Sequence, residues 1–408
     1  MDITLQKSQI ANRQSKITIT GSKSESNRLL LLKALYPTIH LENVSNSDDS
    51  CLMTEALKST SEVVDIHHAG TAMRFLTAYF SIQEGREVTL TGSKRMKERP
   101  IQILVEALQE LGADIEYVEN DGYPPIKIKG KKLLKNKVSL QANVSSQYIS
   151  ALLLIASRLE NGLELTLKGE ITSVPYIKMT LSLLDEIGIE SSFVGNTITI
   201  KPRTQDPEPN TLTVESDWSS ASYYFSIAAL CDVGTEITLS SYKENSLQGD
   251  SVLVEIYKHF GVTSTFNGNS ITLKKETFNF QPLTLNLQNA PDIAQTIAVT
   301  CFALGMPCDL TGLHTLKIKE TDRLVALKTE IEKLGGNVNI TDKSLHLSAS
   351  NAIKEYVPIA TYNDHRMAMA FAPLALKTPI VIEDAEVVSK SYPTFWDDLE
   401  TIGFKITK

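Results

Sequence analysis

The chain has 408 residues, of which 42% are hydrophobic and 22% are charged, as expected for a globular protein with a large core. Its formal net charge of −8 argues against a general nucleic-acid-binding protein and against a partner on an anionic membrane surface. Apolar runs such as residues 151–156 are too short to span a bilayer, and the N-terminus lacks the pattern of a signal peptide.

The first predicted helix starts within Gly21-Ser22-Lys23-Ser24-Glu25-Ser26-Asn27-Arg28, directly before an apolar run. Ser22 and Glu25 have the spacing of a capping box, which would make Ser22 the N-cap. Free backbone N–H groups and the positive end of the helix dipole, together with Lys23, Ser24 and Arg28, indicate an anion site. An ordinary solvated helix start would show the same local pattern, and the Walker P-loop spacing is missing.

The same arrangement recurs along the chain. A first helix with a polar or glycine-rich start is followed by a short strand, an amphipathic second helix that ends at glycine, and a strand pair. The first helices are predicted to start at Ser22, Gly70-Thr71, Ser145-Ser146, Asp217, Asp292 and Asp364. The second helices are predicted over residues 103–112, 181–188, 252–261, 324–335 and 395–403. Six such units indicate a repeat architecture of the α/β class.

A Pro-rich polar segment at residues 201–209 divides the six units into three and three. The last unit has one strand after its second helix, and the N-terminal strands at residues 3–5 and 16–20 could complete it. We therefore expect an N-terminal domain of residues 21–214 and a C-terminal domain of residues 1–20 plus 215–408. Residues 52–66 leave the first repeat shortened, without its hairpin.

The distribution of arginine supports an anion site at the predicted helix starts. Only ten of the forty basic residues are Arg, and six of these lie in or beside the predicted helix starts: Arg28, Arg74, Arg95, Arg99, Arg323 and Arg366. Arginine is suited to bidentate binding of carboxylate or phosphate. If the helix starts face one way within each domain, their dipoles favour a ligand with several negative charges. A repeat architecture without a common site would share the pattern.

No metal site is expected. The cysteines Cys51, Cys231, Cys301 and Cys308 have no metal-ligand spacing, and no second ligand cluster lies near His67-His68. We interpret the four cysteines as reduced thiols of a cytoplasmic protein.

Six segments, taken together and in order, closely resemble the 5-enolpyruvylshikimate-3-phosphate synthase family (3-phosphoshikimate 1-carboxyvinyltransferases). They are Gly21-Ser22-Lys23-Ser24 with Ser26-Asn27-Arg28, Ala69-Gly70-Thr71-Ala72-Met73-Arg74, Arg95-Met96-Lys97-Glu98-Arg99-Pro100-Ile101, Ser145-Ser146-Gln147, Lys319-Glu320-Thr321-Asp322-Arg323 and Asp364-His365-Arg366-Met367-Ala368. Each alone is a weak signal, but the set spans nearly the whole chain.

The resemblance implies the two-domain enolpyruvyl transferase fold, an inverse α/β barrel with three βαβαββ repeats per domain and the site in the interdomain cleft. It implies transfer of the enolpyruvyl group of phosphoenolpyruvate to the 5-hydroxyl of shikimate 3-phosphate, with release of phosphate, in the shikimate pathway to chorismate and the aromatic amino acids. The reaction would proceed by addition and elimination through a tetrahedral adduct. We expect no metal or organic cofactor, no nucleic-acid or membrane partner, and a cytoplasmic monomer.

The resemblance also implies residue roles, position by position. Binding of shikimate 3-phosphate is expected from Lys23, Ser24, Arg28, Ser145, Ser146, Gln147, Ser173, Tyr176, Asp292 and Lys319. Binding of phosphoenolpyruvate is expected from Lys23, Gly70, Arg95, Gln147, Arg323, Arg366 and Lys390. Asp292 would accept the proton of the 5-hydroxyl; a helix N-cap is the structural alternative for this residue, and the two roles are compatible. Glu320 with Lys23 would protonate the methylene carbon of phosphoenolpyruvate.

Two alternatives stay open. The related enolpyruvyl transferase that acts on UDP-N-acetylglucosamine uses a loop cysteine, which residues 95–99 lack. A non-catalytic anion-binding or RNA-binding protein on the same repeat would not need Asp292, Glu320 and Lys23 together.

The chain departs from the family pattern at His68 (usually Asn or Asp), Phe75 (commonly Pro), Thr20 (usually Pro) and Thr315 (Asn in some members). The herbicide glyphosate competes with phosphoenolpyruvate in this family. We expect it to bind, because Gly70 should leave space beside the helix start, but less tightly than in members with Pro at the position of Phe75.

Overall fold

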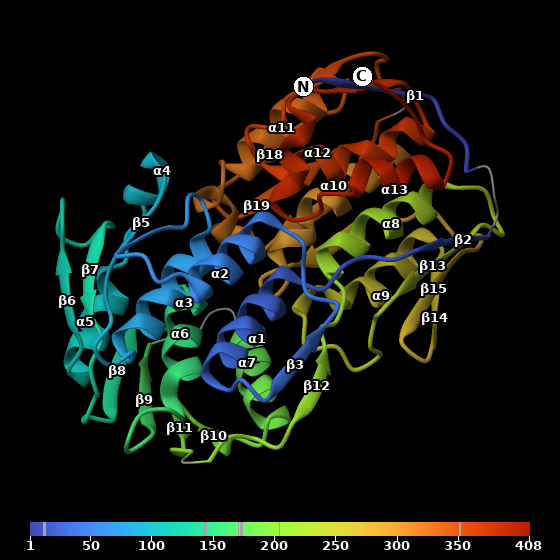
Figure 1. The fold of residues 1–408 in the computed structure, drawn as a ribbon. Coiled ribbons are helices and arrows are strands. Elements are labelled where there is room, and N and C mark those ends of the chain that lie inside the picture. The colour runs from blue at the N-terminus through green and yellow to red at the C-terminus, as the bar shows by residue number, and fades with distance from the viewer. Residues whose placement is uncertain (11–13, 142–144, 170, 172–173, 204, 351) are drawn as a thin grey trace. The chain divides into compact units, whose positions relative to one another are not determined.

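The computed structural model describes residues 1–10, 14–141, 145–169, 171, 174–203, 205–350 and 352–408 (Figure 1). The chain forms two compact units. The continuous unit is Gly21–Val214, and the discontinuous unit combines Met1–Thr20 with Glu215–Lys408. Within the described ranges, no helix has the length and apolarity needed to cross a membrane.

The continuous unit has α1 (Lys23–Leu35), β3 (Ile39–Glu42), α2 (Asp48–Lys58), β4 (Val63–Asp65), α3 (Gly70–Ser81), β5 (Glu87–Thr91), α4 (Lys94–Lys97), α5 (Gln102–Leu111), β6 (Asp114–Tyr117), β7 (Ile126–Lys129), β8 (Lys137–Gln141), α6 (Ser146–Ala156), β9 (Leu163–Lys168), α7 (Val174–Glu186), β10 (Ser191–Val194), β11 (Thr197–Ile200) and β12 (Asn210–Thr213). Its sheets have the strand orders β4-β5-β7-β6 and β10-β11-β9-β8, and β12 pairs with β3. Each four-stranded sheet combines one parallel and two antiparallel pairings.

The discontinuous unit has β1 (Ile3–Gln6), β2 (Gln14–Ile17), α8 (Trp218–Leu230), β13 (Glu236–Ser240), η1 (Gly249–Val252), α9 (Leu253–Ile256), η2 (Tyr257–Phe260), β14 (Val262–Asn267), β15 (Ser270–Lys275), β16 (Leu283–Asn286), η3 (Pro291–Ile293), α10 (Ala294–Leu304), β17 (Cys308–Thr311), η4 (His314–Ile318), α11 (Arg323–Lys333), β18 (Val338–Ile340), β19 (Ser344–Leu347), β20 (Pro358–Ile359), α12 (His365–Phe371), η5 (Ala372–Leu376), β21 (Ile380–Ile382), η6 (Ala385–Lys390), α13 (Phe395–Thr401) and β22 (Lys405–Thr407). Its sheets have the orders β14-β15-β13-β2, β16-β17-β19-β18 and β20-β21-β1-β22.

The three sheets of each unit correspond to its three repeats. The two-stranded sheet β12–β3 belongs to the first repeat, which is the shortened repeat. The element order β8-α6-β9-α7-β10-β11 shows the βαβαββ unit in full. Where the first repeat would need its hairpin, the chain runs from α2 into β4, which pairs with β5 of the next sheet. The sheet β12–β3 therefore stays two-stranded.

Strand β2 differs from the expectation that both N-terminal strands complete the last repeat. Strand β1 does so, because it lies between β21 and β22. Strand β2 instead pairs in parallel with β13, in the sheet that follows α8. Strand β12 precedes α8 in sequence but pairs with β3 of the continuous unit. By chain order, β2 would join the sheet of β3, which follows α1, and β12 would join the sheet of β13, which follows α8. Each strand instead pairs in the other sheet.

The first helices of the repeats form the centre of each unit. Helices α1, α3 and α6 pack together in the continuous unit, and α8, α10 and α12 pack together in the discontinuous unit (Figure 1). Every residue of α3 is buried, as are nearly all residues of α8. A helix that is buried all round needs apolar and small residues on every face, and their sequences supply them.

Three local predictions are corrected. Ser22 is the N-cap residue of α1, but its hydroxyl makes no capping hydrogen bond, so the capping box does not form. The single helix expected over residues 252–261 is instead η1, α9 and η2, which end at Gly261 with φ of +70°. The helix expected over residues 181–188 begins earlier, at Val174.

Candidate active site

Arg28 is the most enclosed cation of the continuous unit's predicted site. Its guanidinium donates to Thr180 Oγ1 at 2.8 Å, to the Ser24 carbonyl at 2.6 Å and to Ser150 Oγ at 3.0 Å. These partners within the described residues are neutral oxygens. Burial lowers the pKa of Arg28 to about 10, so the side chain is still charged at neutral pH. A buried cation with neutral partners favours the approach of an anion.

The Arg28 guanidinium also lies against two aromatic rings. Its Cζ is 5.4 Å from the centroid of the Phe75 ring and 5.8 Å from that of Tyr176. Tyr176 was expected from the resemblance, whereas Phe75 was seen only as a departure from the family. Ser173, expected beside Tyr176, lies outside the described residues.

The start of α6 contacts the start of α3. Ser145 is the N-cap of α6 and accepts a hydrogen bond from the Gln147 N–H at 3.4 Å. The Gln147 side-chain amide donates to Thr71 Oγ1 at 3.2 Å, which places it next to Gly70. Ser146 is the first residue of α6. Helix starts that meet in this way direct their free N–H groups and positive dipole ends to one region.

The space beside Gly70 is occupied, contrary to our expectation. A Cβ atom placed on Gly70 would lie 2.5 Å from Arg99 Nη1 and 3.0 Å from Arg99 Cζ. Arg74 is also close, and donates to the carbonyls of Gly70 and Pro100, each at 3.1 Å. Glycine thus admits the Arg99 side chain, and two guanidinium groups flank the start of α3.

Arg74 resembles Arg28 in its surroundings. Burial, with the nearby Arg99, lowers its pKa to about 10. Its Nε has no hydrogen-bond partner among the residues that the structure describes. An unpaired buried donor is costly unless a ligand or water completes it.

Lys23 and Arg95 are more exposed. Lys23 Nζ lies 3.8 Å from Asp49 Oδ2, and its side chain is partly buried. Arg95 lies in the short helix α4, donates to Glu98 at 3.1 Å and has a side chain that is 72% exposed. Arg95 is therefore far more exposed than the buried Arg28 and Arg74.

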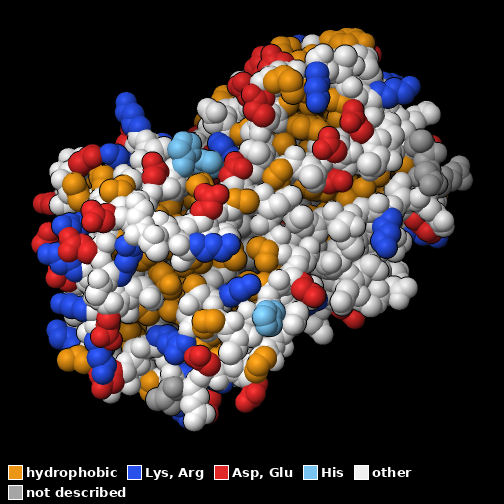
Figure 2. Space-filling view, viewed as in Figure 1, with side chains coloured by type: hydrophobic (Ala, Val, Ile, Leu, Met, Phe, Trp, Pro, Cys, Tyr) orange, Lys and Arg blue, Asp and Glu red, His pale blue; other side chains and the backbone are white. Residues whose placement is uncertain are grey.

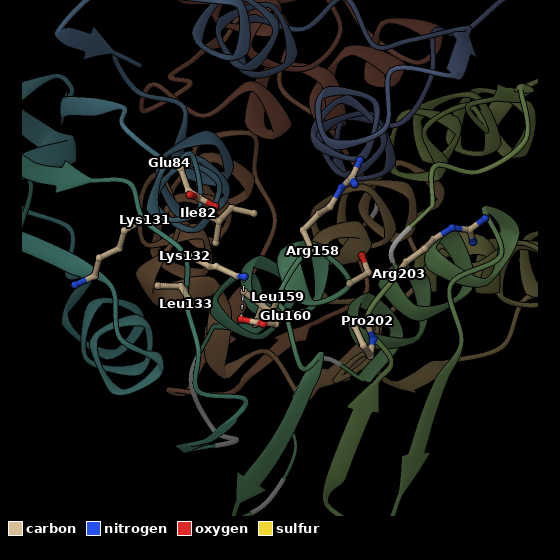
Figure 3. A pocket seen from close by; sticks show the side chains of 11 residues that line it. Ile82, Glu84, Lys131, Lys132, Leu133, Arg158, Leu159, Glu160, Pro202 and Arg203 are labelled. Carbon is tan, nitrogen blue, oxygen red and sulfur yellow. Dashed lines mark ion pairs between the residues drawn. The ribbon is translucent and has the colours of Figure 1, made fainter.

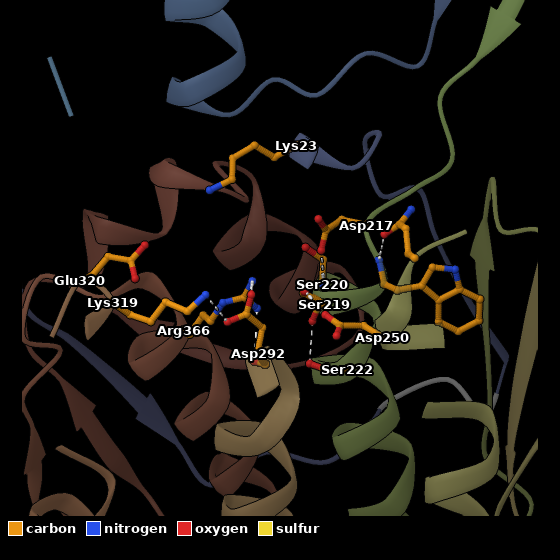
Figure 4. Close-up of polar contacts among 12 residues, drawn as sticks. Lys23, Asp217, Ser219, Ser220, Ser222, Asp250, Asp292, Lys319, Glu320 and Arg366 are labelled. Atoms are coloured by element: carbon orange, nitrogen blue, oxygen red, sulfur yellow. Dashed lines mark hydrogen bonds and ion pairs between the residues drawn. The ribbon is translucent and has the colours of Figure 1, made fainter. Parts of the chain in front are cut away.

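In the discontinuous unit, Asp292 is surrounded by cations. Its Oδ1 is 2.8 Å from Arg323 Nη1. Lys319 and Arg366 also face it (Figure 4), with Lys319 Nζ 3.4 Å from Oδ1 and Arg366 Nη2 3.5 Å from Oδ2. Burial alone would raise the pKa of Asp292, but Lys319, Arg366 and Arg323 outweigh it and hold the pKa well below its usual range. Asp292 lies in η3 and makes no helix-capping bond, so the simple N-cap role is wrong.

Arg323 connects three carboxylates. It donates from Nε to Asp364 at 2.6 Å, from Nη1 to Asp292 at 2.8 Å and from Nη2 to Glu320 at 2.8 Å. Burial would lower the pKa of Arg323, but the carboxylates, led by Asp364, raise it. Asp364 is fully buried and also caps α12, because its Oδ1 accepts from the Arg366 N–H at 2.9 Å. Asp364, predicted only as a helix start, thereby fixes Arg323 and the first turn that carries Arg366.

A left-handed turn precedes Asp364. Tyr362 and Asn363 both have φ of +55°, which is uncommon for residues other than glycine. The Asn363 carbonyl accepts a hydrogen bond from Lys390 Nζ at 2.6 Å. Tyr362 donates its hydroxyl to the buried carboxylate of Glu330 at 2.6 Å. This turn holds Lys390, the last residue of η6, beside the start of α12.

His68 forms a pair with its neighbour. The Nδ1 atoms of His67 and His68 are 2.7 Å apart, and His68 Nε2 lies 3.8 Å from Asp48. The described residues contain no group of three or more side chains arranged to hold a metal ion.

Several cations elsewhere in the continuous unit have a carboxylate partner. A hollow of about 260 Å³ lies near the C-terminal ends of α3 and α6, and Lys131, Lys132, Arg158 and Arg203 line it (Figure 3). Lys132 pairs with Glu160 at 3.1 Å, and Arg158 pairs with Asp206 at 2.7 Å.

On the outer face of the sheet β4-β5-β7-β6, blue and red side chains intermingle (Figure 2), as in the ion pairs of Lys97 with Glu119 and Lys127 with Glu87. These paired cations contrast with Arg28 and Arg74.

Comparisons with known proteins agree with the site chemistry. Residues 58–399 match the sequence model of a family described as EPSP synthase (3-phosphoshikimate 1-carboxyvinyltransferase). The chain is 47% identical over 398 residues to a 3-phosphoshikimate 1-carboxyvinyltransferase of Bacteroides fragilis, and this match covers 96% of each protein. It is 35% identical over 428 residues to the enzyme of the same name from Histophilus somni, covering 97% of this chain and 98% of that one.

Two solved structures share the fold. The EPSP synthase of Acinetobacter baumannii has a TM-score of 0.82 at 21% identity, with both chains fully covered. The enolpyruvyl transferase NikO of Streptomyces tendae has a TM-score of 0.74 at 13% identity, covering all of this chain and 98% of that one.

Proposed function

We propose, because the chain belongs to the EPSP synthase (3-phosphoshikimate 1-carboxyvinyltransferase) family, that it transfers the enolpyruvyl group of phosphoenolpyruvate to the 5-hydroxyl of shikimate 3-phosphate and releases phosphate. The observation that carries the proposal is Asp292 with Lys319, Arg323 and Arg366 within 3.5 Å of its carboxylate. A carboxylate that can accept a proton, beside cations that can bind phosphate and carboxylate, is what this transfer needs.

The continuous unit is proposed to bind the anionic groups of the substrates. Arg28, with Ser24, Ser145, Ser146 and Gln147, would hold the phosphate of shikimate 3-phosphate, and Tyr176 and Ser173 would extend this group. Support comes from Arg28, whose described hydrogen-bond partners are neutral oxygens. Gly70, Arg95 and Lys23 would bind phosphoenolpyruvate. Because Arg99 and Arg74 lie next to Gly70, we add both to the cations of that group.

The discontinuous unit is proposed to carry the proton transfers. In the first step Asp292 accepts the proton of the 5-hydroxyl as its oxygen bonds to C2 of phosphoenolpyruvate, while the methylene carbon gains a proton from Glu320 acting with Lys23. In the second step Glu320 takes a proton back from the methyl group as the bond between C2 and the phosphate oxygen breaks, and the phosphate leaves with the proton held by Asp292. Arg323, Arg366 and Lys390 would hold phosphoenolpyruvate and then the leaving phosphate.

The cations around Asp292 also set its reactivity. A carboxylate whose pKa is held well below its usual range is ionised but weakly basic. Anionic substrates compete for Lys319 and Arg366, and each cation drawn away raises the basicity of Asp292. Substrate binding would therefore make Asp292 a better base in the complex than in the free protein.

We further propose that the two units are the two domains, that the protein works as a cytoplasmic monomer, and that small molecules rather than nucleic acids are its partners. The net charge of −8 supports the absence of a nucleic-acid partner, and cysteines without metal-ligand spacing support a cytoplasmic protein.

Release of inorganic phosphate tests the function. The purified protein is mixed with phosphoenolpyruvate and either shikimate 3-phosphate or UDP-N-acetylglucosamine. Rapid release with shikimate 3-phosphate alone supports the proposal, and release with UDP-N-acetylglucosamine alone would replace it with the related transferase. Release with neither acceptor would favour a non-catalytic anion-binding protein.

A further inference from the structure

A serine, a histidine and an aspartate form a hydrogen-bond network on the sheet β16-β17-β19-β18 of the discontinuous unit. Asp309 Oδ1 lies 2.6 Å from His346 Nδ1, and His346 Nε2 lies 2.9 Å from Ser344 Oγ. Ser344 Oγ is also 2.6 Å from Thr341 Oγ1. These residues have no part in the predicted site or in the proposed enolpyruvyl transfer.

The register of two paired strands brings the side chains together. Ser344 and His346 are two positions apart in β19, so their side chains lie on the same face of the sheet. In the neighbouring strand β17, Asp309 is directly opposite His346. Leu345, between Ser344 and His346, takes the other face and is fully buried. The side chains of His346 and Asp309 are 42% and 57% exposed, so this face is open to solvent.

The hydrogen bonds of the network can all run in one direction. The Lys343 N–H donates to Thr341 Oγ1 at 3.3 Å, so the Thr341 hydroxyl can donate to Ser344 Oγ. The carboxylate of Asp309 at Nδ1 favours the neutral tautomer of His346 that has its proton on Nδ1. Nε2 then accepts from the Ser344 hydroxyl. A nucleophile, a base and a third group that orients the base are thus joined in the order that serine acylation requires.

We propose that Ser344 is an activated nucleophile that takes the acyl group of a small aryl ester, with His346 as its base and Asp309 as the residue that positions His346. Ser344 Oγ bonds to the acyl carbon, its proton passes to His346 Nε2, and the aryloxide leaves with the electron pair of its bond to that carbon. The Thr341 hydroxyl, 2.6 Å from Ser344 Oγ, can then donate to the acyl oxygen. The product is an ester of Ser344.

The burial of Ser344 limits the acyl donor. Ser344 is only 6% exposed, although His346 beside it is open to solvent. A small acyl group is therefore the proposed one, and an acetyl ester is the probe that fits it.

The main test incubates the purified protein with p-nitrophenyl acetate and maps the acetylated residues by mass spectrometry. We expect an acetyl group on Ser344 that neutral hydroxylamine removes, because hydroxylamine cleaves esters but leaves the amides formed by lysines. His346→Gln should lower the rate of Ser344 acetylation by about 10²-fold, which is the contribution of a positioned base. Ser270 is the matched control, because its hydroxyl donates to the Asn267 carbonyl at 2.8 Å, and it should stay unmodified.

The positioning role of Asp309 has its own readout. Asp309→Asn should lower the rate of Ser344 acetylation about tenfold or more, and Asp309→Glu should restore it to within about threefold. The exposure of Asp309 lets both variants fold, so they decide the matter if His346→Gln does not fold.

Acetylation of Ser344 no faster than that of Ser270 would overturn the inference, as would an unchanged rate in Asp309→Asn. The inference is independent of the proposed function. Phosphate release from phosphoenolpyruvate and shikimate 3-phosphate should be the same in Ser344→Ala as in the unaltered protein, so the two proposals fail separately.

Discussion

The reactivity of Asp292 can be separated from its part in binding. We expect Asp292→Ala to lose catalysis by about 10²–10⁴-fold, because it removes a positioned base, and to keep measurable affinity for shikimate 3-phosphate. Glu320→Ala should behave alike, since its proposed work is proton transfer. Turnover and calorimetric binding of shikimate 3-phosphate provide the two readouts.

Asp342→Asn is the control for these variants, because Asp342 is 91% exposed and pairs only with Lys317 among the described ion pairs. Near-normal turnover of Asp292→Ala or Glu320→Ala would remove that residue from the mechanism. Loss of shikimate 3-phosphate binding in both would indicate that they order the site rather than move protons.

Phe75 gives a second residue-scale prediction, because its ring lies against the Arg28 guanidinium. A desolvated cation–π contact of this kind contributes about 1–2 kcal/mol. We expect Phe75→Leu to raise KM for shikimate 3-phosphate roughly five- to thirtyfold while KM for phosphoenolpyruvate changes little. Phe80→Leu, another buried ring of α3, controls for the loss of core packing. Equal changes in the two Phe variants would show that the cation–π contact is unimportant.

That glyphosate binds less tightly here than in members with Pro at the position of Phe75 remains a prediction. Open space beside Gly70 no longer supports binding of the inhibitor. Arg99 rather than open space lies beside Gly70, and the Phe75 ring lies against the Arg28 guanidinium. If Phe75 tunes the inhibitor site, Phe75→Pro should lower the inhibition constant of glyphosate relative to KM for phosphoenolpyruvate.

Asp250, a buried residue of η1, affects the pH dependence of folding. Its pKa in the folded protein, about 6, exceeds the ordinary value, so the folded state binds this proton more tightly than the unfolded state. The resulting stabilisation is fully present below about pH 4 and is lost as pH rises through 6. A shift of two units corresponds to about 3 kcal/mol. We expect Asp250→Asn to flatten the fall in stability between pH 4 and 7, measured by urea unfolding.

At the scale of elements, the turn before α12 provides a paired test. Asn363 has φ of +55° and presents its carbonyl to Lys390. Asn363→Gly relieves the backbone strain and keeps the carbonyl, so stability and activity should be preserved. Asn363→Val places a β-branched residue at this φ and should cost about 1–3 kcal/mol. Thermal unfolding and KM for phosphoenolpyruvate are the measurements, and equal stabilities of the two variants would contradict the prediction.

Elements were predictable where their signals are local. The starts of α6, α8 and α12 carry capping side chains at Ser145, Asp217 and Asp364, and Gly112 ends α5 in the left-handed conformation. The capping box at Ser22 failed although the spacing was right, because the box depends on side-chain directions that spacing does not set. The pairing of β2 with β13 joins residues more than two hundred positions apart, so no local pattern specifies it.

The candidate site shows the same division. The residues that follow from the family resemblance were named by motif, and the structure gathers Asp292, Lys319, Arg323 and Arg366 as a cluster. The Arg99 contact at Gly70 was missed, because it depends on packing between elements that local sequence patterns do not relate.

At the scale of the molecule, the two units can be followed separately, because both tryptophans, Trp218 and Trp396, lie in the discontinuous unit. Leu5→Ala in β1 should lower the stability of that unit by about 2–5 kcal/mol and shift the unfolding transition seen by tryptophan fluorescence. Leu153→Ala in α6 should instead shift a transition seen mainly by circular dichroism. A single common shift for both variants would show that the units unfold as one.

The division of the chain has a consequence during translation. Once the ribosome has released Val214, every strand of the continuous unit's sheets has been made, and that unit can fold. Strand β1 has left the ribosome long before, but its partners β21 and β22 are among the last segments to be synthesised. From that point until β21 and β22 are made, the nascent chain therefore carries an N-terminal strand without its partner strands. Any factor that binds exposed strands has its longest opportunity at Ile3–Gln6, and slowing translation should prolong it.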